Sequence, residues 1–234
     1  MLVTEFIRDL SVGELKNMAY SGNGTGLVAR KDQVALLRYV NDALNKLYAR
    51  YALSTKDILL ETQTGVTIYH LLPQFAETQA ATSPEPVQYI KDLSREPFTG
   101  DVLRILEVYN GAGIRVPVND ENQELSVFTP EYNMLQIPYA VGGELWTVVY
   151  KAKHQTLTET HLNTRMTVPP SLLPSLRSYV AYKVYCDVGT QEALVRAQQY
   201  LQRYELETQE IELTNMVNNS VVPTNLKLEI GGWV

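Results

Sequence analysis

Hydrophobic residues change their spacing twice along the chain, from a helical period to strict alternation and back again. The first clear pattern lies in residues 31–53, where apolar residues recur at intervals of three and four. They are Val34, Leu37, Val40, Leu44, Leu47, Tyr48 and Tyr51. This spacing predicts one amphipathic helix with Asp32 as its N-cap. Its stripe is expected to pack in a core, and a partner surface is the alternative.

A shorter helix and a glycine-rich stretch precede it. Ser11 and Glu14 have the spacing of a capping box, which predicts a brief helix that ends near Tyr20. The sequence SGNGTG follows, over residues 21–26. A phosphate-binding loop needs a strand before it and a Gly-Lys-Ser/Thr step after it. Neither is present, so we interpret this stretch as a linker between helices.

The middle of the chain, from Lys56 to about His154, alternates with a period of two. Residues 57–72 are interpreted as a hairpin that turns at residues 63–65, and five further short apolar runs follow, separated by Gly, Asn and Pro. This pattern predicts an antiparallel β-sandwich or small barrel. Residues 73–100 are expected to make a surface excursion, with one helical turn around Tyr89 and Ile90.

Helical spacing returns near residue 170. Pro174 suits the first turn of one helix, Gly189 its end, and Thr190 the N-cap of the next. The predicted fold class is therefore α+β: a helical bundle from the N- and C-terminal helices, an inserted antiparallel β module and an extended C-terminal arm. The predicted boundaries are 1–55 with 165–215 for the bundle, 56–164 for the β domain and 216–234 for the arm.

The arm alternates again near its end. Leu226, Leu228 and Ile230 are separated by Lys227 and Glu229, as in a strand that adds to the sheet edge of a neighbour. A disordered terminus is the alternative. The candidate partner-binding residues, toward a docking partner or a neighbouring subunit, are Val221, Val222, Leu226, Leu228, Ile230, Trp233 and Val234.

Composition narrows the function classes. The 234 residues are 45% hydrophobic and carry a formal charge of −6, so we expect a globular protein that does not bind nucleic acid generally. The single cysteine, Cys186, excludes an internal disulfide. Neither a signal peptide nor a membrane span is expected, because no apolar run is long enough.

Side chains suited to chemistry are scattered. The histidines, His70, His154 and His161, lack the spacing of a metal site. Cys186 has no local activating group and is expected in a core. The carboxylate pairs Glu205/Glu207 and Asp120/Glu121 are expected to be solvated. We therefore predict no enzyme activity, no metal and no cofactor. Seven tyrosines on predicted helices suit cores and subunit interfaces alike.

The order of these elements resembles the head-to-tail connector, or adaptor, proteins of tailed bacteriophages, particularly short-tailed ones. The segments that carry the resemblance span most of the chain. They are Phe6–Asn17, Val34–Leu53, Asp57–Thr62, Leu145–Leu157 and Pro169–Glu205. The resemblance implies a structural virion protein at the head–tail interface, assembled in the host cytoplasm. It also implies a ring of about a dozen copies that joins the portal to the tail or nozzle, without catalytic residues.

A ring fits the charge of the chain. Twelve copies at −6 each carry −72, and a lumen lined by part of that charge would let DNA pass without specific binding. A closed ring needs two different patches on each subunit, which a chain with helical faces, β faces and an arm offers. The alternatives are a stopper or tail-completion protein and a β-sandwich module that binds receptors or glycans. The last would use exposed loop aromatics, mainly Phe98 and Tyr132.

Overall fold

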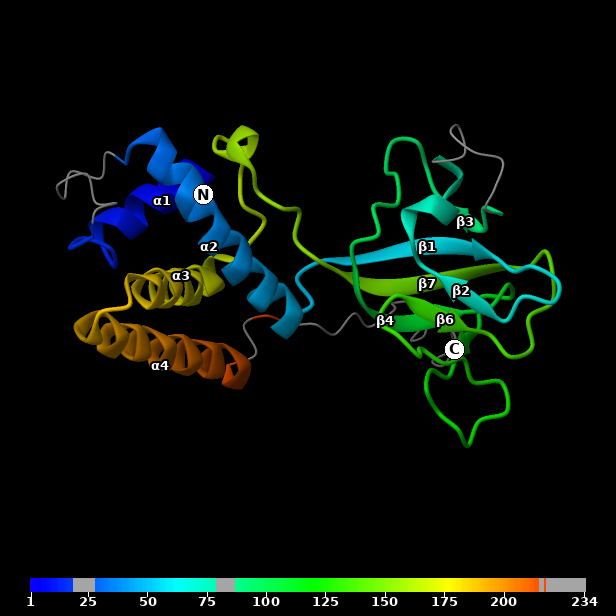
Figure 1. The fold of residues 1–234 in the computed structure, drawn as a ribbon. Coiled ribbons are helices and arrows are strands. Elements are labelled where there is room, and N and C mark those ends of the chain that lie inside the picture. The colour runs from blue at the N-terminus through cyan, green and yellow to red at the C-terminus, as the bar shows by residue number, and fades with distance from the viewer. Residues whose placement is uncertain (19–27, 79–86, 215–216, 218–234) are drawn as a thin grey trace, which may run out of the picture. The chain divides into compact units, whose positions relative to one another are not determined.

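A computed structural model describes residues 1–18, 28–78, 87–214 and 217 (Figure 1). The chain divides into two compact units. One consists of Met1–Leu47 with Thr156–Val234, and we call it the helical unit; the other is Tyr48–Gln155, the β unit. The combination of helices with antiparallel sheets confirms the predicted α+β class. The glycine-rich stretch 21–26 and the predicted arm, apart from residue 217, lie outside the described residues.

Four long helices supply most of the helical unit. They are α1 (Val3–Val12), α2 (Arg30–Arg50), α3 (Leu173–Val188) and α4 (Gln191–Leu213). Their fully buried side chains include Phe6 and Ile7 of α1, Leu44 of α2 and Val180 of α3. Each buried aliphatic or aromatic side chain of this size stabilises the fold by about 1.5–3 kcal/mol relative to its exposed state.

Helix α1 begins earlier than the sequence analysis predicted. Val3, Phe6, Ile7 and Leu10 form a fully buried stripe at helical spacing, and the Leu2 N–H donates to Glu5 Oε2 at the helix start (2.7 Å). Ser11 is therefore not an N-cap. It lies in the last turn, where its hydroxyl donates to the Arg8 carbonyl (2.7 Å). The capping-box spacing was misleading because it lies where this helix ends.

Helix α2 confirms the predicted long helix, with two corrections. It begins at Arg30, so Asp32 lies inside the first turn and is not the N-cap. Val34, assigned to the apolar stripe, is exposed, whereas Leu36 and Ala43 are fully buried. The buried stripe is thus displaced toward one side of the predicted one.

The predicted junction between α3 and α4 is confirmed. Gly189 has φ of +70°, the left-handed conformation that favours glycine after a helix. The Thr190 hydroxyl oxygen accepts from the Ala193 N–H (3.3 Å) as the N-cap of α4. Tyrosines fill the contact between the two helices, since the Tyr179 ring packs on Tyr204 with ring centroids 5.0 Å apart.

The β unit contains two antiparallel sheets. The first has the strand order β3-β1-β7-β4-β5 and the second pairs β2 with β6. Side chains from both sheets, among them Leu60, Tyr69, Leu135 and Val148, belong to one apolar core. The described strands do not form a closed barrel. The bounds are β1 Thr55–Glu61, β2 Ile68–His70, β3 Ile90–Lys91, β4 Val102–Tyr109, β5 Arg115–Val116, β6 Met134–Gln136 and β7 Leu145–Ala152.

The predicted hairpin of residues 57–72 is wrong in its pairing. A turn does occur with Gly65 at φ +79°, but β1 pairs with β3 and β7, whereas β2 pairs with β6. The Tyr69 hydroxyl explains the geometry: it accepts from the Gln63 N–H (2.9 Å) and donates to the Val66 carbonyl (2.9 Å). The residues between β1 and β2 therefore form a loop that connects the first sheet to the second.

The long excursion of residues 73–100 contains a strand where one helical turn was predicted. Ile90 and Lys91 form β3 against Leu60 and Leu59, and Ile90 is fully buried. The Tyr89 hydroxyl accepts from the His70 N–H and donates to the His70 carbonyl, both at 2.9 Å. Residues 124–128, one of the other segments predicted as strands, do not form a strand of either sheet and make only isolated β-bridges.

Candidate interaction surfaces

Helix α4 carries an uncharged stripe along its exposed face. Six exposed positions recur at alternating intervals of four and three: Val195, Gln199, Gln202, Leu206, Gln209 and Leu213. We call them the α4 stripe. Val195 is 52% exposed, Leu206 67% and Leu213 88%. The opposite face, with Ala197, Tyr204 and Ile211, is buried.

The spacing of the α4 stripe is that of the contact seam between packed helices. Arg196 and Arg203 lie on one side of it, and Glu205 and Glu212 lie on the other. An isolated helix face exposed to water normally carries charges throughout. Exposed leucines between charged borders are instead typical of a face that another protein surface covers.

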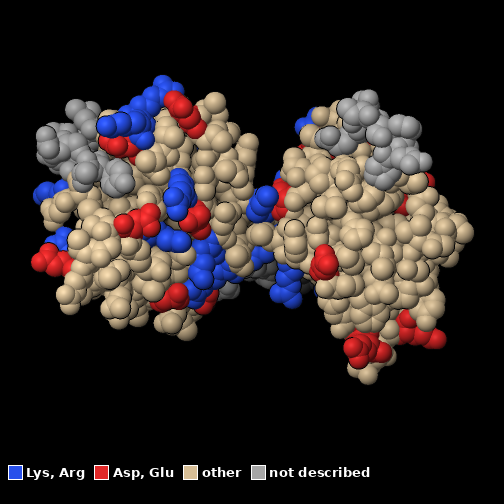
Figure 2. Space-filling view, in the orientation of Figure 1, with Lys and Arg blue, Asp and Glu red and all other residues tan. Residues whose placement is uncertain are grey.

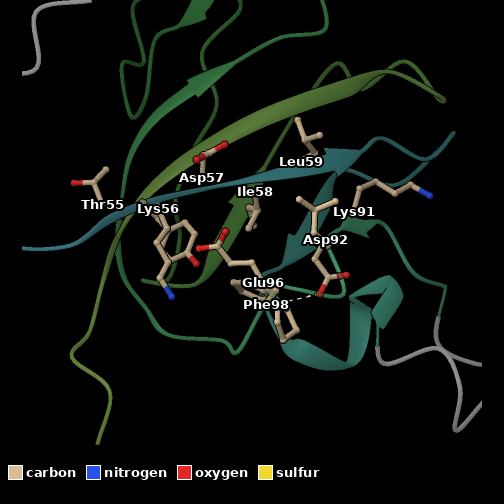
Figure 3. Close-up of a pocket in the computed structure, with 12 residues that line it drawn as sticks. Thr55, Lys56, Asp57, Ile58, Leu59, Lys91, Asp92, Glu96 and Phe98 are labelled. Carbon is tan, nitrogen blue, oxygen red and sulfur yellow. Dashed lines mark hydrogen bonds between the residues drawn. The ribbon is translucent and has the colours of Figure 1, made fainter. Parts of the chain in front are cut away.

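A second surface follows the open edge of β1 in the β unit. A pocket of about 270 Å³ lies there, lined on one side by Thr55–Leu59 and on the other by Lys91–Leu93 and Glu96–Phe98 (Figure 3). Figure 3 shows Ile58, Glu96 and Phe98 on one side of the strand and Asp57 and Leu59 on the other.

Asp92 holds the far wall of this pocket in place. Its carboxylate accepts from the Thr78 N–H (3.0 Å), the Thr78 hydroxyl and the Phe98 N–H (2.8 Å). Burial acts to raise the pKa of Asp92, but these hydrogen bonds outweigh it and hold the pKa below the usual 3.8. The segment that faces β1 is thereby fixed at both of its ends.

A buried carboxylate supports the near wall. Asp101 is 7% exposed, and its Oδ1 accepts from the Tyr150 hydroxyl (3.0 Å) while its Oδ2 lies 2.7 Å from Lys56 Nζ. Burial first, and then the charge of Asp101, raise the pKa of Tyr150 far above its usual value. The hydroxyl therefore stays protonated and donates throughout the physiological range.

Lys91 of β3 forms an ion pair with β1 at the end of the pocket. Its ammonium group lies 2.8 Å from Glu61 Oε2 and also pairs with Glu77. Hydrogen bonds from these two carboxylates raise the pKa of Lys91 above 10.5. The pocket thus combines Lys56 and Lys91, which form ion pairs within the fold, with two exposed leucines, Leu59 and Leu93.

A third surface lies on loops of the β unit around a smaller pocket of about 110 Å³. Leu125, Tyr139, Val141 and Leu145, from the loops and from the start of β7, are half or more exposed. Figure 2 shows that the face of the β unit in view is largely free of charged side chains. For glycan binding, Phe98 is not available because it is buried, whereas Tyr132 is exposed as expected.

The histidines serve structure at separate places. The His70 backbone bonds to Tyr89, the His154 ring packs edge-on against Tyr48 (5.1 Å between centroids), and His161 Nδ1 accepts from the Thr158 N–H (3.0 Å). Within the described part of the chain, no cluster of His, Cys, Asp and Glu could hold a metal ion.

The remaining chemical candidates also have structural surroundings. Cys186 is half-buried, not in the core as predicted. Glu207, predicted to be solvated, accepts from Ser178 Oγ (3.0 Å) and Arg203 Nε (2.9 Å), and so ties α4 to α3. Asp120 is half-buried, and its side chain accepts from the Asn122 N–H in a turn (3.0 Å).

The predicted partner-binding residues, from Val221 to Val234, lie outside the described residues. The sequence analysis did not find the three surfaces described above. The α4 stripe has a signal in the sequence, namely its four–three spacing without charges. Among the described helices, none has the length and apolar character needed to cross a membrane.

Comparison with known proteins gives one family. The model of the SU10 adaptor protein family matches residues 11–224. This range covers α2, α3, α4 and the whole β unit. No curated protein matches the sequence.

Proposed function

Because the chain belongs to the SU10 adaptor protein family, a family of phage head–tail adaptors, we propose that its copies form a ring that joins the portal to the tail. The ring is proposed to be a dodecamer in the virion, and DNA passes through its lumen. The protein acts by binding other subunits and catalyses no reaction.

The α4 stripe is the observation that carries this proposal. A ring needs head-to-tail contacts, in which one patch of a subunit meets a different patch of the next. The stripe supplies a patch of six uncharged positions between Val195 and Leu213. We assign it to the contact with the neighbouring copy, where Leu206 and Leu213 become buried.

Charge supports passage of DNA without binding. The residues of the β unit include 8 Lys or Arg and 13 Asp or Glu, a difference of −5, out of −6 for the whole chain. Figure 2 shows blue side chains gathered mainly over the helical unit. An acidic subunit repels the phosphate backbone, so a ring of such subunits retains no DNA.

The arm supplies the remaining contact in this proposal. Val221, Val222, Leu226, Leu228, Ile230, Trp233 and Val234 bind the portal or a neighbouring subunit. Their apolar alternation in an otherwise polar segment supports this role.

The test is to mix the purified chain with a portal ring and to count bound copies by native mass spectrometry and electron microscopy. The proposal expects a closed ring of about twelve copies bound to the portal. A chain that stays monomeric and does not bind the portal contradicts it. Binding of a single copy as a plug would support the stopper alternative.

A further inference from the structure

Among the described residues, half of strand β1 is paired on one side only. On one side, β1 pairs with β7 along its whole length, from Thr55 opposite Lys151 to Glu61 opposite Leu145. On the other side only Leu59 and Leu60 pair with β3. Among the described strands, none pairs with residues 55–58 on that side.

The direction of the main-chain groups follows from the bonds nearby. The Glu61 N–H donates to Tyr89 on the β3 side, and the Thr62 N–H donates to Glu144 on the β7 side. Because these groups alternate along an antiparallel strand, the N–H and C=O of Thr55 and Asp57 point to the open edge. Such an edge is a template for another strand.

The pocket described above lies directly beside this edge. Ile58 and Phe98 are buried at its floor, and the Phe98 N–H donates to the Asp92 carboxylate across the loop beyond. On the rim, Leu59 is 41% exposed and Leu93 is 57% exposed. The edge thus presents main-chain donors and acceptors beside a recess that has an apolar floor and whose lining also includes the charged side chains of Lys56 and Glu96.

We propose that this edge receives residues 226–230 of a second copy of the chain as an added strand. This inference rests on the proposed ring. The five residues extend over about 17 Å, enough to span the four unpaired residues of β1, which extend over about 13 Å. Leu226, Leu228 and Ile230 face the recess over Ile58, and Lys227 lies beside Asp57 on the outer side.

A second copy is the occupant because arm and edge are two different surfaces of one chain. The arm of each subunit on the edge of the next makes a head-to-tail contact, and repetition of that contact closes a ring. Pairing of the arm with the edge of its own chain would satisfy the edge but would link no subunits.

Hydrogen exchange of the full-length protein tests this directly. In the assembled ring, amide exchange in peptides that cover residues 53–60 is expected to be at least about tenfold slower than in the dilute monomer. Leu228→Pro and Lys227→Pro provide a matched pair. Only alternate residues of an added strand donate to the edge, and proline is tolerated where the N–H faces solvent.

One of these two variants should therefore lose the protection and assemble at least about tenfold more weakly than the alanine variant at the same position, whereas the other proline variant should match its own alanine variant. Asp57→Pro removes the N–H that donates from the β1 edge to the added strand and should match the disruptive variant; circular dichroism of its monomer checks that it folds. A ring that forms without protection of residues 53–60, or equal effects of the two prolines, overturns the inference and leaves the proposed function standing.

Two other outcomes also overturn it. Protection already present in the dilute monomer means that the arm pairs with its own chain. Absence of any assembly by the wild-type chain refutes the proposed function, and this inference with it.

Discussion

Replacing two exposed leucines of the α4 stripe with lysines should abolish assembly without unfolding the subunit. The double variant Leu206→Lys/Leu213→Lys places two ammonium groups in the proposed contact. Both leucines are largely exposed in the isolated chain, and substitutions at such positions change the free energy of unfolding by about 0.5 kcal/mol or less. Loss of assembly would therefore report on the contact alone.

The magnitude follows from the exposed fractions. Full burial of a leucine contributes about 1.5–3 kcal/mol, and these side chains expose 67% and 88% of their area. Together they contribute about 2–5 kcal/mol to each contact between neighbours. A loss of about 3 kcal/mol raises the dissociation constant of that contact more than about 100-fold.

The assay is native mass spectrometry with portal rings over a range of subunit concentrations, beside urea unfolding of each monomer. Leu194→Lys is the matched control, because Leu194 is 45% exposed on the same helix but lies outside the stripe. The reasoning is refuted if the double variant assembles like wild type. It is also refuted if Leu194→Lys weakens assembly equally.

Three further predictions concern the β unit, and urea unfolding followed by near-ultraviolet circular dichroism measures each. Tyr150→Phe removes the bond to buried Asp101 and should destabilise the fold by about 1.5–3 kcal/mol; an unchanged midpoint would contradict that role. Since hydrogen bonds hold the pKa of Asp92 below 3.8, its contribution is present above that pH and is lost as the pH falls through the folded value. Asp92→Asn should therefore lose less stability than wild type on acidification, and an equal loss would argue against it. Gly142→Ala places a methyl group 2.8 Å from a backbone nitrogen and should cost about 1–3 kcal/mol, whereas Gly111→Ala meets nothing closer than 3.6 Å and should be tolerated.

Local signals predicted much of the fold correctly. The junction at Gly189 and Thr190 is confirmed because its cues act within a few residues. The start of α1 was missed although its cue is equally local: the stripe from Val3 to Leu10 competes with the capping-box spacing at Ser11, and burial of the stripe prevails.

The pairing of the strands could not be predicted from the sequence. Leu60 pairs with Trp146, far along the chain, and not with the neighbouring strand β2. The choice depends on which arrangement fills one core, and no residue of the run 57–72 encodes it alone. The open edge of β1 was unpredictable for the same reason, because an edge is defined by which strands pair elsewhere.

The composition of the α4 stripe also bears on the timing of virion assembly. Glutamine occupies three of its six positions, so each contact between neighbours gains apolar burial from the other three alone. Contacts of moderate strength leave newly made subunits dispersed, whereas a platform that holds many copies side by side raises their effective concentration. Under the proposed function, such a contact would make the portal ring, and not chance encounter between free copies, the nucleus on which the ring of subunits grows.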